Sequence, residues 1–215
     1  MKNIQGNILF LIGLIALQWT PTQQLEGGPV WGYRCLNSRC EKVALSDNDA
    51  LTKAVSMQVC RLYCADTFGT LWPKPTRNYR LGHSLIHIDP YAIEFQWGKQ
   101  YETLSRQWDI SAERFRNQLK NRPIGEEVKS GGKRMEVKVA IDSDSLVLNH
   151  ETDESYKLSI SSADGGNVAV KIEAPTYFGA RHGLETLAQL IVFDDLRSEL
   201  QVVADVEISD APAYP

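Results

Sequence analysis

The sequence lacks a surplus of basic residues and has no basic cluster. Its 215 residues include 23 Lys and Arg against 27 Asp and Glu, for a formal net charge of −4. Chains that bind nucleic acid concentrate positive charge on one surface, so we exclude nucleic acid as a partner. The same charge pattern gives no support to a role at a membrane surface. Hydrophobic residues make up 43% of the chain, which is a globular value and excludes an intrinsically disordered class.

Motifs for phosphate binding and for metalloprotease chemistry are also missing. Gly131-Gly132 precedes a predicted strand, whereas a phosphate-binding loop would be followed by a helix. His83 and His87 have the four-residue spacing of a zinc-protease helix, but they lie at a predicted strand. Ser84 also stands where such a helix would carry its glutamate. We therefore predict no metal site and interpret the two histidines as polar positions on one strand face.

The apolar run at the N-terminus is too short for a membrane span. It covers residues 8–17, follows Lys2, and could not cross roughly 30 Å of hydrocarbon. A short apolar run after a positive residue is typical of a secretory signal peptide. We predict that residues 1–22 are a signal peptide, that the mature protein is secreted and extracellular, and that no membrane span remains. The cleavage point, between Leu17 and Gln24, is not marked by a small-x-small motif, and the chain contains no Asn-x-Ser/Thr acceptor.

Cysteine is confined to one short region, at Cys35, Cys40, Cys60 and Cys64. A zinc site is the competing interpretation, but close cysteine pairs in a secreted chain more often form disulfides. Three pairings are formally open. The spacing suits two antiparallel segments and favours the nested pairing Cys35–Cys64 and Cys40–Cys60.

These cysteines predict a small stapled appendage over residues 23–70. Residues 48–61 within it have the spacing of a helix. Trp31, Tyr33 and Trp72 could stack on sugar rings. We favour the alternative that they pack against the cystine cluster and its junction with the main domain, because small disulfide folds need aromatic bulk in place of a core.

The rest of the chain predicts a sheet with two covering helices. Apolar and polar residues alternate in several short segments, and a helical stripe runs from about Thr103 to Leu119. The alternative is a start at Ser111, with Ile110 and Phe115 as a hydrophobic staple. Asp164-Gly165-Gly166-Asn167 reads as a hairpin turn between two of the strands. The expected strands are residues 85–89 and 92–97, joined tightly at Pro90-Tyr91, then 135–141, 156–160, 168–172 and 202–208. The sum is an α+β fold, a mostly antiparallel sheet covered on one face by two helices.

The second helix, in residues 174–193, is central to this arrangement. Thr176 can cap its first amides. Apolar residues then recur at helical spacing with no charge among them: Tyr177, Ala180, Leu184, Leu187, Ala188 and Ile191. We predict a core helix that covers the half-buried strands.

Three motifs give the chain a resemblance to a known family. Residues 178–190, Phe-Gly-Ala-Arg-His-Gly-Leu-Glu-Thr-Leu-Ala-Gln-Leu, resemble the end of the N-terminal domain of glycoside hydrolase family 20 β-N-acetylhexosaminidases. Leu71-Trp72-Pro73-Lys74-Pro75 is similar to the start of that domain, and residues 210–215 are similar to the passage into the catalytic barrel. The cysteine-containing part is closest to secreted insect members that act on chitooligosaccharides. The resemblance implies a domain over residues 71–208 and a linker over 209–215.

The resemblance also implies where chemistry is absent. The family uses an Asp-Glu dyad after a His-x-Gly-Gly motif, and the substrate's acetamido group makes the nucleophilic attack. The only Asp-Glu pair here, Asp153-Glu154, lacks that motif, and its context predicts a solvated turn. The resemblance therefore implies no catalytic or substrate-binding residue in this chain, no cofactor, and a parent enzyme whose barrel lies beyond it. A homodimer of the parent is left open.

Five residues on the second helix are candidates for contact with the barrel: Gly179, Arg181, His182, Gly183 and Glu185. The two glycines would weaken a helix, which suggests a close approach by either this domain's own sheet or the barrel. Simple exposure is the third option for them. A different function remains in competition, a free-standing secreted module that binds chitin through Trp31, Tyr33 and Trp72.

Overall fold

The structure, a computed structural model, describes residues 31–45, 53–64, 71–98, 102–122 and 128–212. The predicted signal peptide therefore lies outside the described residues. The elements in chain order are β1 (Trp31–Leu36), β2 (Arg39–Ala44), α2 (Met57–Cys64), β3 (Tyr79–Arg80), β4 (Leu85–Trp97), η1 (Glu102–Leu104), α3 (Ser105–Lys120), β5 (Lys133–Ile141), β6 (Tyr156–Ser162), η2 (Asp164–Gly166), β7 (Val168–Ala174), α4 (Tyr177–Gln189), β8 (Ile191–Asp194), β9 (Glu199–Val203) and β10 (Val206–Asp210). No helix in these ranges is long and apolar enough to cross a membrane.

Eight strands form one sheet in the order β3-β10-β6-β7-β5-β4-β9-β8. β5 pairs in parallel with both β4 and β7, and the other neighbours are antiparallel. The alternation in the sequence explains why one face is buried. In β5, for example, every second residue from Met135 to Ile141 is buried. The predicted turn at residues 164–167 joins β6 to β7, with Gly165 and Gly166 at positive φ.

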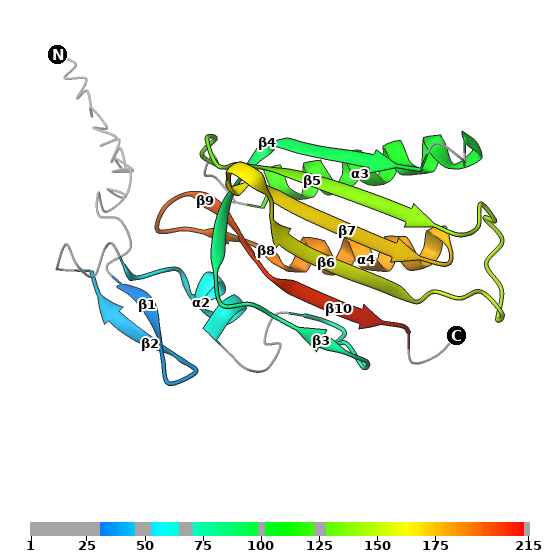
Figure 1. Cartoon of the computed structure of the whole chain (residues 1–215). Coiled ribbons are helices and arrows are strands. Elements are labelled where there is room, and N and C mark those ends of the chain that lie inside the picture. The colour runs from blue at the N-terminus through cyan, green and yellow to red at the C-terminus, as the bar shows by residue number, and fades with distance from the viewer. Residues whose placement is uncertain (1–30, 46–52, 65–70, 99–101, 123–127, 213–215) are drawn as a thin grey trace, which may run out of the picture.

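Both predicted helices cover the same face of this sheet, where α3 and α4 lie side by side (Figure 1). Thr176 caps α4 as predicted, because its hydroxyl accepts the Gly179 N–H at 3.2 Å. Leu187 and Ala180 of α4 are fully buried against the strands. The α+β prediction, with a mostly antiparallel sheet covered on one face by two helices, is confirmed.

Three predicted boundaries are wrong. The segments 85–89 and 92–97 form the single strand β4, which continues through Pro90. Proline has no N–H to donate to a neighbouring strand. The pairing of β4 with β5 shifts register between Ile88 and Ile93, so no hydrogen bond from residue 90 is needed there. Asp89 Oδ1 accepts the Tyr91 N–H within this irregular stretch.

The second error concerns the end of the core helix. α4 stops at Gln189, and Ile191, predicted to continue its stripe, begins β8 instead. The run Ile191-Val192-Phe193 has strong β propensity and pairs with β9. A short apolar run after a helix cannot be assigned by periodicity alone.

The third error concerns the strand expected at residues 202–208. The chain forms two strands there, because β9 ends at Val203 and β10 begins at Val206. Asp205 between them has a φ of 58°, which breaks the extended backbone. β9 pairs with β4 and β8, whereas β10 pairs with β6 and β3.

The N-terminal appendage is a hairpin of β1 and β2 with α2 against it (Figure 1). The disulfides Cys35–Cys64 and Cys40–Cys60 confirm the nested pairing, and no described cysteine is free. Three of the sulfurs lie close enough together for a metal, but all are oxidised, so the zinc interpretation is wrong. The helix predicted at residues 48–61 begins only at Met57. Val55 bridges Tyr33, and residues 48–52 lie outside the described ranges.

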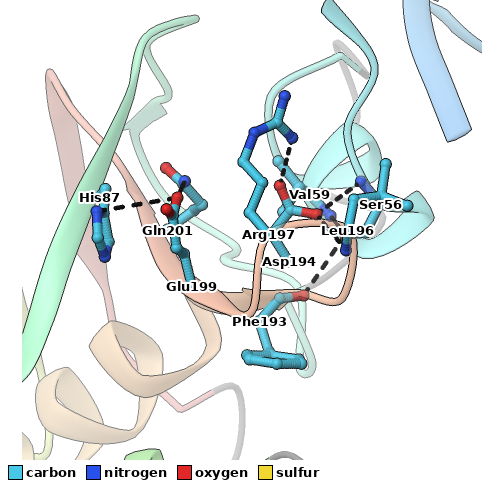
Figure 2. Close-up of polar contacts among 9 residues, drawn as sticks. All are labelled: Ser56, Val59, His87, Phe193, Asp194, Leu196, Arg197, Glu199 and Gln201. Atoms are coloured by element: carbon cyan, nitrogen blue, oxygen red, sulfur yellow. Dashed lines mark hydrogen bonds and ion pairs between the residues drawn. The ribbon is translucent and has the colours of Figure 1, made fainter. Parts of the chain in front are cut away.

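The appendage is fixed to the main sheet by a buried carboxylate at the end of β8 (Figure 2). Asp194 accepts hydrogen bonds from the backbone N–H of Ser56 and of Leu196, each at 3.1 Å, and pairs with Arg197 at 2.8 Å. The Ser56 hydroxyl in turn accepts the Val59 N–H at the start of α2. Val59 and Leu62 belong to the same apolar cluster as the sheet.

Candidate interdomain surface

The outer side of the helix layer carries a groove of about 510 Å³. It lies between α3 and α4, with the connection from β5 to β6 at one end. Its lining mixes apolar and charged side chains: Gln107, Ile110, Ser111, Arg114, Phe115, Gln118, Leu148, Glu154, Tyr177, Phe178, Arg181, His182, Leu184 and Glu185. Three of the five predicted contact residues, Arg181, His182 and Glu185, therefore line one surface, and all three are exposed.

The start of α4 is held by the turn that precedes β6. The Thr176 hydroxyl donates to the Asp153 carbonyl at 2.7 Å while it caps the helix. Tyr177 packs edge-to-face on Trp108 of α3, with ring centroids 4.9 Å apart, and its hydroxyl lies 3.1 Å from the Ser111 hydroxyl. These contacts fix the two helices relative to each other, so the groove is preformed.

The Asp153-Glu154 pair has no catalytic geometry. Asp153 Oδ1 accepts the Ser155 N–H at 2.9 Å, and hydrogen bonds from Ser155 hold the pKa of the Asp153 carboxyl below its ordinary value. A glycosidase acid needs the opposite shift, because it must keep its proton near neutral pH. Glu154 is engaged differently, since its Oε2 lies 2.6 Å from His182 Nε2 across the end of the groove. This pair therefore ties α4 to the preceding turn.

The two glycines of α4 face this domain's own sheet. An added Cβ at Gly183 would lie 2.8 Å from Ile172 Cγ2 and 3.3 Å from the Tyr156 ring. At Gly179 it would collide with the carbonyl oxygen of Ser155. Both glycines are buried in the described structure. Their close approach is therefore explained inside the domain, and contact with a barrel is not needed to account for them.

An exposed apolar segment next to the groove was missed by the sequence reasoning. Leu146, Val147 and Leu148 have exposed fractions of 43%, 67% and 59%. The segment has a defined conformation, because Val147 N–H donates to Ser145 and the Val147 carbonyl accepts from the Thr152 hydroxyl. We call residues 146–148 the apolar strap. Three consecutive apolar residues outside the alternating strands were the available signal.

Arg122, which the sequence reasoning also missed, caps the C-terminal end of α4. The Arg122 guanidinium donates to the Ala188 carbonyl in the last turn, which is a favourable place for a cation. Burial lowers the pKa of Arg122, and the nearby Glu185 carboxylate opposes that shift. Glu185 thus stabilises the charge that terminates its own helix.

The histidines and tryptophans singled out in the sequence do not come together as a site. His83 Nδ1 lies 3.1 Å from the Tyr63 carbonyl, and His87 Nδ1 lies 3.8 Å from Glu199 Oε2 (Figure 2). Trp72 is 84% exposed, so the prediction that it packs against the cystine cluster and its junction with the main domain is wrong. Trp31 is half exposed beneath Lys42, whereas Tyr33 is partly buried and bonded through its backbone to Val55.

Comparison with known proteins identifies the domain. The family model described as beta-acetyl hexosaminidase like matches residues 71–190. The chain is 36% identical to a chitooligosaccharidolytic beta-N-acetylglucosaminidase of Bombyx mori, over 99% of this chain and 35% of that protein. It is also 36% identical to the protein of that name from Ostrinia furnacalis, over 96% of this chain and 34% of that protein.

Among solved structures, a chitobiase of Flavobacterium johnsoniae matches 67% of this chain and 21% of its own, with a TM-score of 0.45 and 22% identity. The chain spans about a third of the length of the curated relatives it matches. The family match covers more than half of the chain and includes the motifs at residues 71–75 and 178–190. The chain therefore belongs to the beta-acetyl hexosaminidase-like domain family of glycoside hydrolase family 20.

Proposed function

We propose that this chain is the non-catalytic N-terminal portion of a secreted β-N-acetylhexosaminidase. The parent enzyme removes terminal N-acetylglucosamine from chitooligosaccharides or glycans, without a cofactor. In this proposal the helix layer docks on the catalytic barrel and buttresses it. The observation that carries the proposal is the exposed apolar strap beside a preformed groove, in a chain about a third as long as its curated relatives.

The physical argument starts from the cost of exposing apolar surface. Isolated exposed apolar residues are ordinary, but a contiguous patch usually marks an interaction site. Here the strap continues into the groove through Leu148, and Ile110 adds a further side chain that is 41% exposed. Arg181 and Glu185 add charges of both signs. An apolar centre with a polar rim is the usual anatomy of a protein interface.

Secretion is part of the proposal. Two disulfides link the appendage, and disulfides persist in oxidising compartments. The apolar run at residues 8–17 after Lys2 fits a signal peptide. Both features favour an extracellular enzyme.

A second candidate function is a free-standing chitin-binding module. It is favoured by the exposure of Trp72 and Trp31, at 84% and 50%. Flat aromatic rings can cover sugar faces, and here two of them reach solvent. Incubation of the chain with chitin beads separates the candidates, because a buttress would stay in solution and a binding module would be retained.

The test of the main proposal uses residues 23–215 and a longer protein that continues past residue 215. The shorter protein should not hydrolyse a chromogenic N-acetylglucosaminide, and the longer one should. Leu148→Asp should lower the melting temperature of the longer protein and leave that of the shorter one nearly unchanged. Leu36→Asp is the matched control, since Leu36 is also exposed, at 46%, but lies in the hairpin of the appendage. Equal effects of Leu148→Asp on both proteins would contradict docking at this surface.

A further inference from the structure

The most exposed large apolar side chain among the described residues is Trp72, and its backbone is held rigidly. The side-chain amide of Gln189 makes two hydrogen bonds to the backbone of Trp72. Its Oε1 accepts the Trp72 N–H at 2.7 Å, and its Nε2 donates to the Trp72 carbonyl at 2.9 Å. The neighbours Leu71 and Pro75 are buried. The segment is therefore fixed on both sides while the indole ring projects into solvent.

Trp72 lies on the side of α4 that carries the groove. His182, Glu185 and Gln189 follow one another at three- and four-residue spacing, so they share one face of the helix. The first two line the groove, and Gln189 holds Trp72 about 6 Å further along the helix axis. The ring thus extends the surface that the proposed function assigns to the barrel.

Trp72 also lies near the point where the chain leaves the domain. The Asp210 carboxylate, in the last residue of β10, accepts the Thr76 N–H at 2.9 Å and the Thr76 hydroxyl at 3.0 Å. Four residues separate Thr76 from Trp72, a reach of at most about 14 Å. The Trp72 segment and the described end of the chain are therefore joined through Thr76 and Asp210.

From these contacts we propose that Trp72 is a preorganised anchor that inserts into an apolar pocket of the domain following residue 215. This inference rests on the proposed function and names the residue that dominates its interface. Tryptophan is enriched among such dominant residues, and a backbone that is already fixed loses little freedom on binding. The Gln189 amide therefore acts by positioning the ring.

A sugar is the less suitable occupant. Carbohydrate binding combines a stacked ring with polar groups that reach the hydroxyls. Among the described residues, the polar groups near Trp72 are otherwise engaged. Gln189 is bonded to the Trp72 backbone, and Thr76 to Asp210. The Lys74 ammonium lies 6.0 Å from the centre of the Tyr79 ring. In the part of the chain that the structure describes, no set of free polar groups surrounds the ring, which suits an apolar protein pocket.

Hydroxyl-radical footprinting with mass spectrometry tests the anchor directly. Residues 23–215 and the longer protein are oxidised in parallel, and Trp31 serves as the internal control because it is half exposed on the appendage. We expect Trp72 to oxidise several-fold more slowly in the longer protein and Trp31 to oxidise equally in both. Equal oxidation of Trp72 in the two proteins would overturn the proposal.

Thermal melts of Trp72→Ala provide the second measurement. The ring makes little contact within this chain, so the variant should leave the melting temperature of residues 23–215 unchanged and lower that of the longer protein. If Leu148→Asp weakens only the longer protein while Trp72→Ala does not, the anchor is wrong and the buttress stands. If neither variant distinguishes the two proteins, both proposals fail. Retention of residues 23–215 on chitin beads that is lost in Trp72→Ala would assign the ring to a sugar and overturn the anchor.

Discussion

The disulfide-linked appendage and the sheet domain are stabilised in different ways. In the sheet domain, β5 and β7 bury every second residue beneath two helices. In the appendage, β1 and β2 are mostly exposed or half-buried, and the fully covered side chains come chiefly from α2. A segment that cannot build a core of its own needs cross-links and a surface to dock on. The appendage has both, through its disulfides and through Asp194.

The stability of the appendage therefore depends on its junction with the sheet domain as well as on its disulfides. Asp194 lies 138 residues from Ser56 in sequence but accepts its N–H in the folded chain (Figure 2). Burial raises the pKa of the nearby Tyr63, which Arg197 and Asp194 influence in opposite directions. The junction is therefore a polar contact in which Asp194 and Ser56 are buried and Arg197 is partly exposed. Removing one partner from such a contact lowers stability, because the other partner is left buried without its hydrogen bond.

The largest expected effect comes from Asp194→Ala. The change leaves the amides of Ser56 and Leu196 and the charge of Arg197 without their shared acceptor. Leaving a buried donor such as the Ser56 N–H unsatisfied costs about 1–3 kcal/mol, and loss of the bond to the partly exposed Arg197 adds to that cost. Urea unfolding of residues 23–215 should show this loss, with α2 separating from β8. Asp109→Ala, on the exposed side of α3, is the matched control and should have little effect. A similar loss of stability in Asp109→Ala would contradict a specific stabilising role of Asp194 at the junction.

The next effect is expected from the disulfides. The double variant Cys40→Ser, Cys60→Ser opens a link between residues 20 apart, which should cost about 3 kcal/mol by chain entropy. Hydrogen exchange should rise in β1 and β2 and remain slow in β5, because only the hairpin depends on the link. Equal loss of protection in β5 would show that the two parts unfold as one unit.

Much of this architecture could be predicted from sequence because the signals are local. Alternation of apolar and polar residues located β5, β6 and β7, and Thr176 marked the start of α4. The nested cysteine pairing followed from spacing that suits antiparallel segments. Each of these predictions depends on residues close to one another in the chain.

The predictions that failed depend on distant partners. Pro90 ends a strand by its own chemistry, but the register shift against β5 lets β4 continue. Ile191 fits a helical stripe, but pairing with Val202 of β9 makes it a strand. Nothing near Asp194 in sequence indicates that it holds Ser56, and nothing near Trp72 indicates that Gln189 fixes its backbone. The groove residues of α4 could be named from the helix. The apolar strap beside them was missed, although its three consecutive apolar residues are visible in the sequence.

The smallest expected effect tests how tightly the sheet domain packs. Gly183→Val would place a Cβ 2.8 Å from Ile172 Cγ2 and 3.3 Å from the Tyr156 ring, and its two methyl groups would add further volume there. The neighbours are side chains that can shift slightly, so we expect overpacking of about 1–3 kcal/mol. Because the sheet is the neighbour, residues 23–215 and the longer protein should lose stability alike. Thermal melts of both proteins measure the loss of stability. Hydrogen exchange should increase less in β1 and β2 than in the strands of the sheet domain.

Gly183→Ala sharpens the result. Alanine adds only the Cβ and gains about 0.8–1 kcal/mol of helix propensity over glycine, which opposes the contact with Ile172. Its net effect should therefore be smaller than that of valine. If valine destabilised the longer protein alone, the barrel rather than the sheet would be the close neighbour of α4 at this position. If valine raised the melting temperature of both proteins, the contact between α4 and Ile172 would be loose. The sheet domain would then not be packed as tightly as we infer from its buried strands.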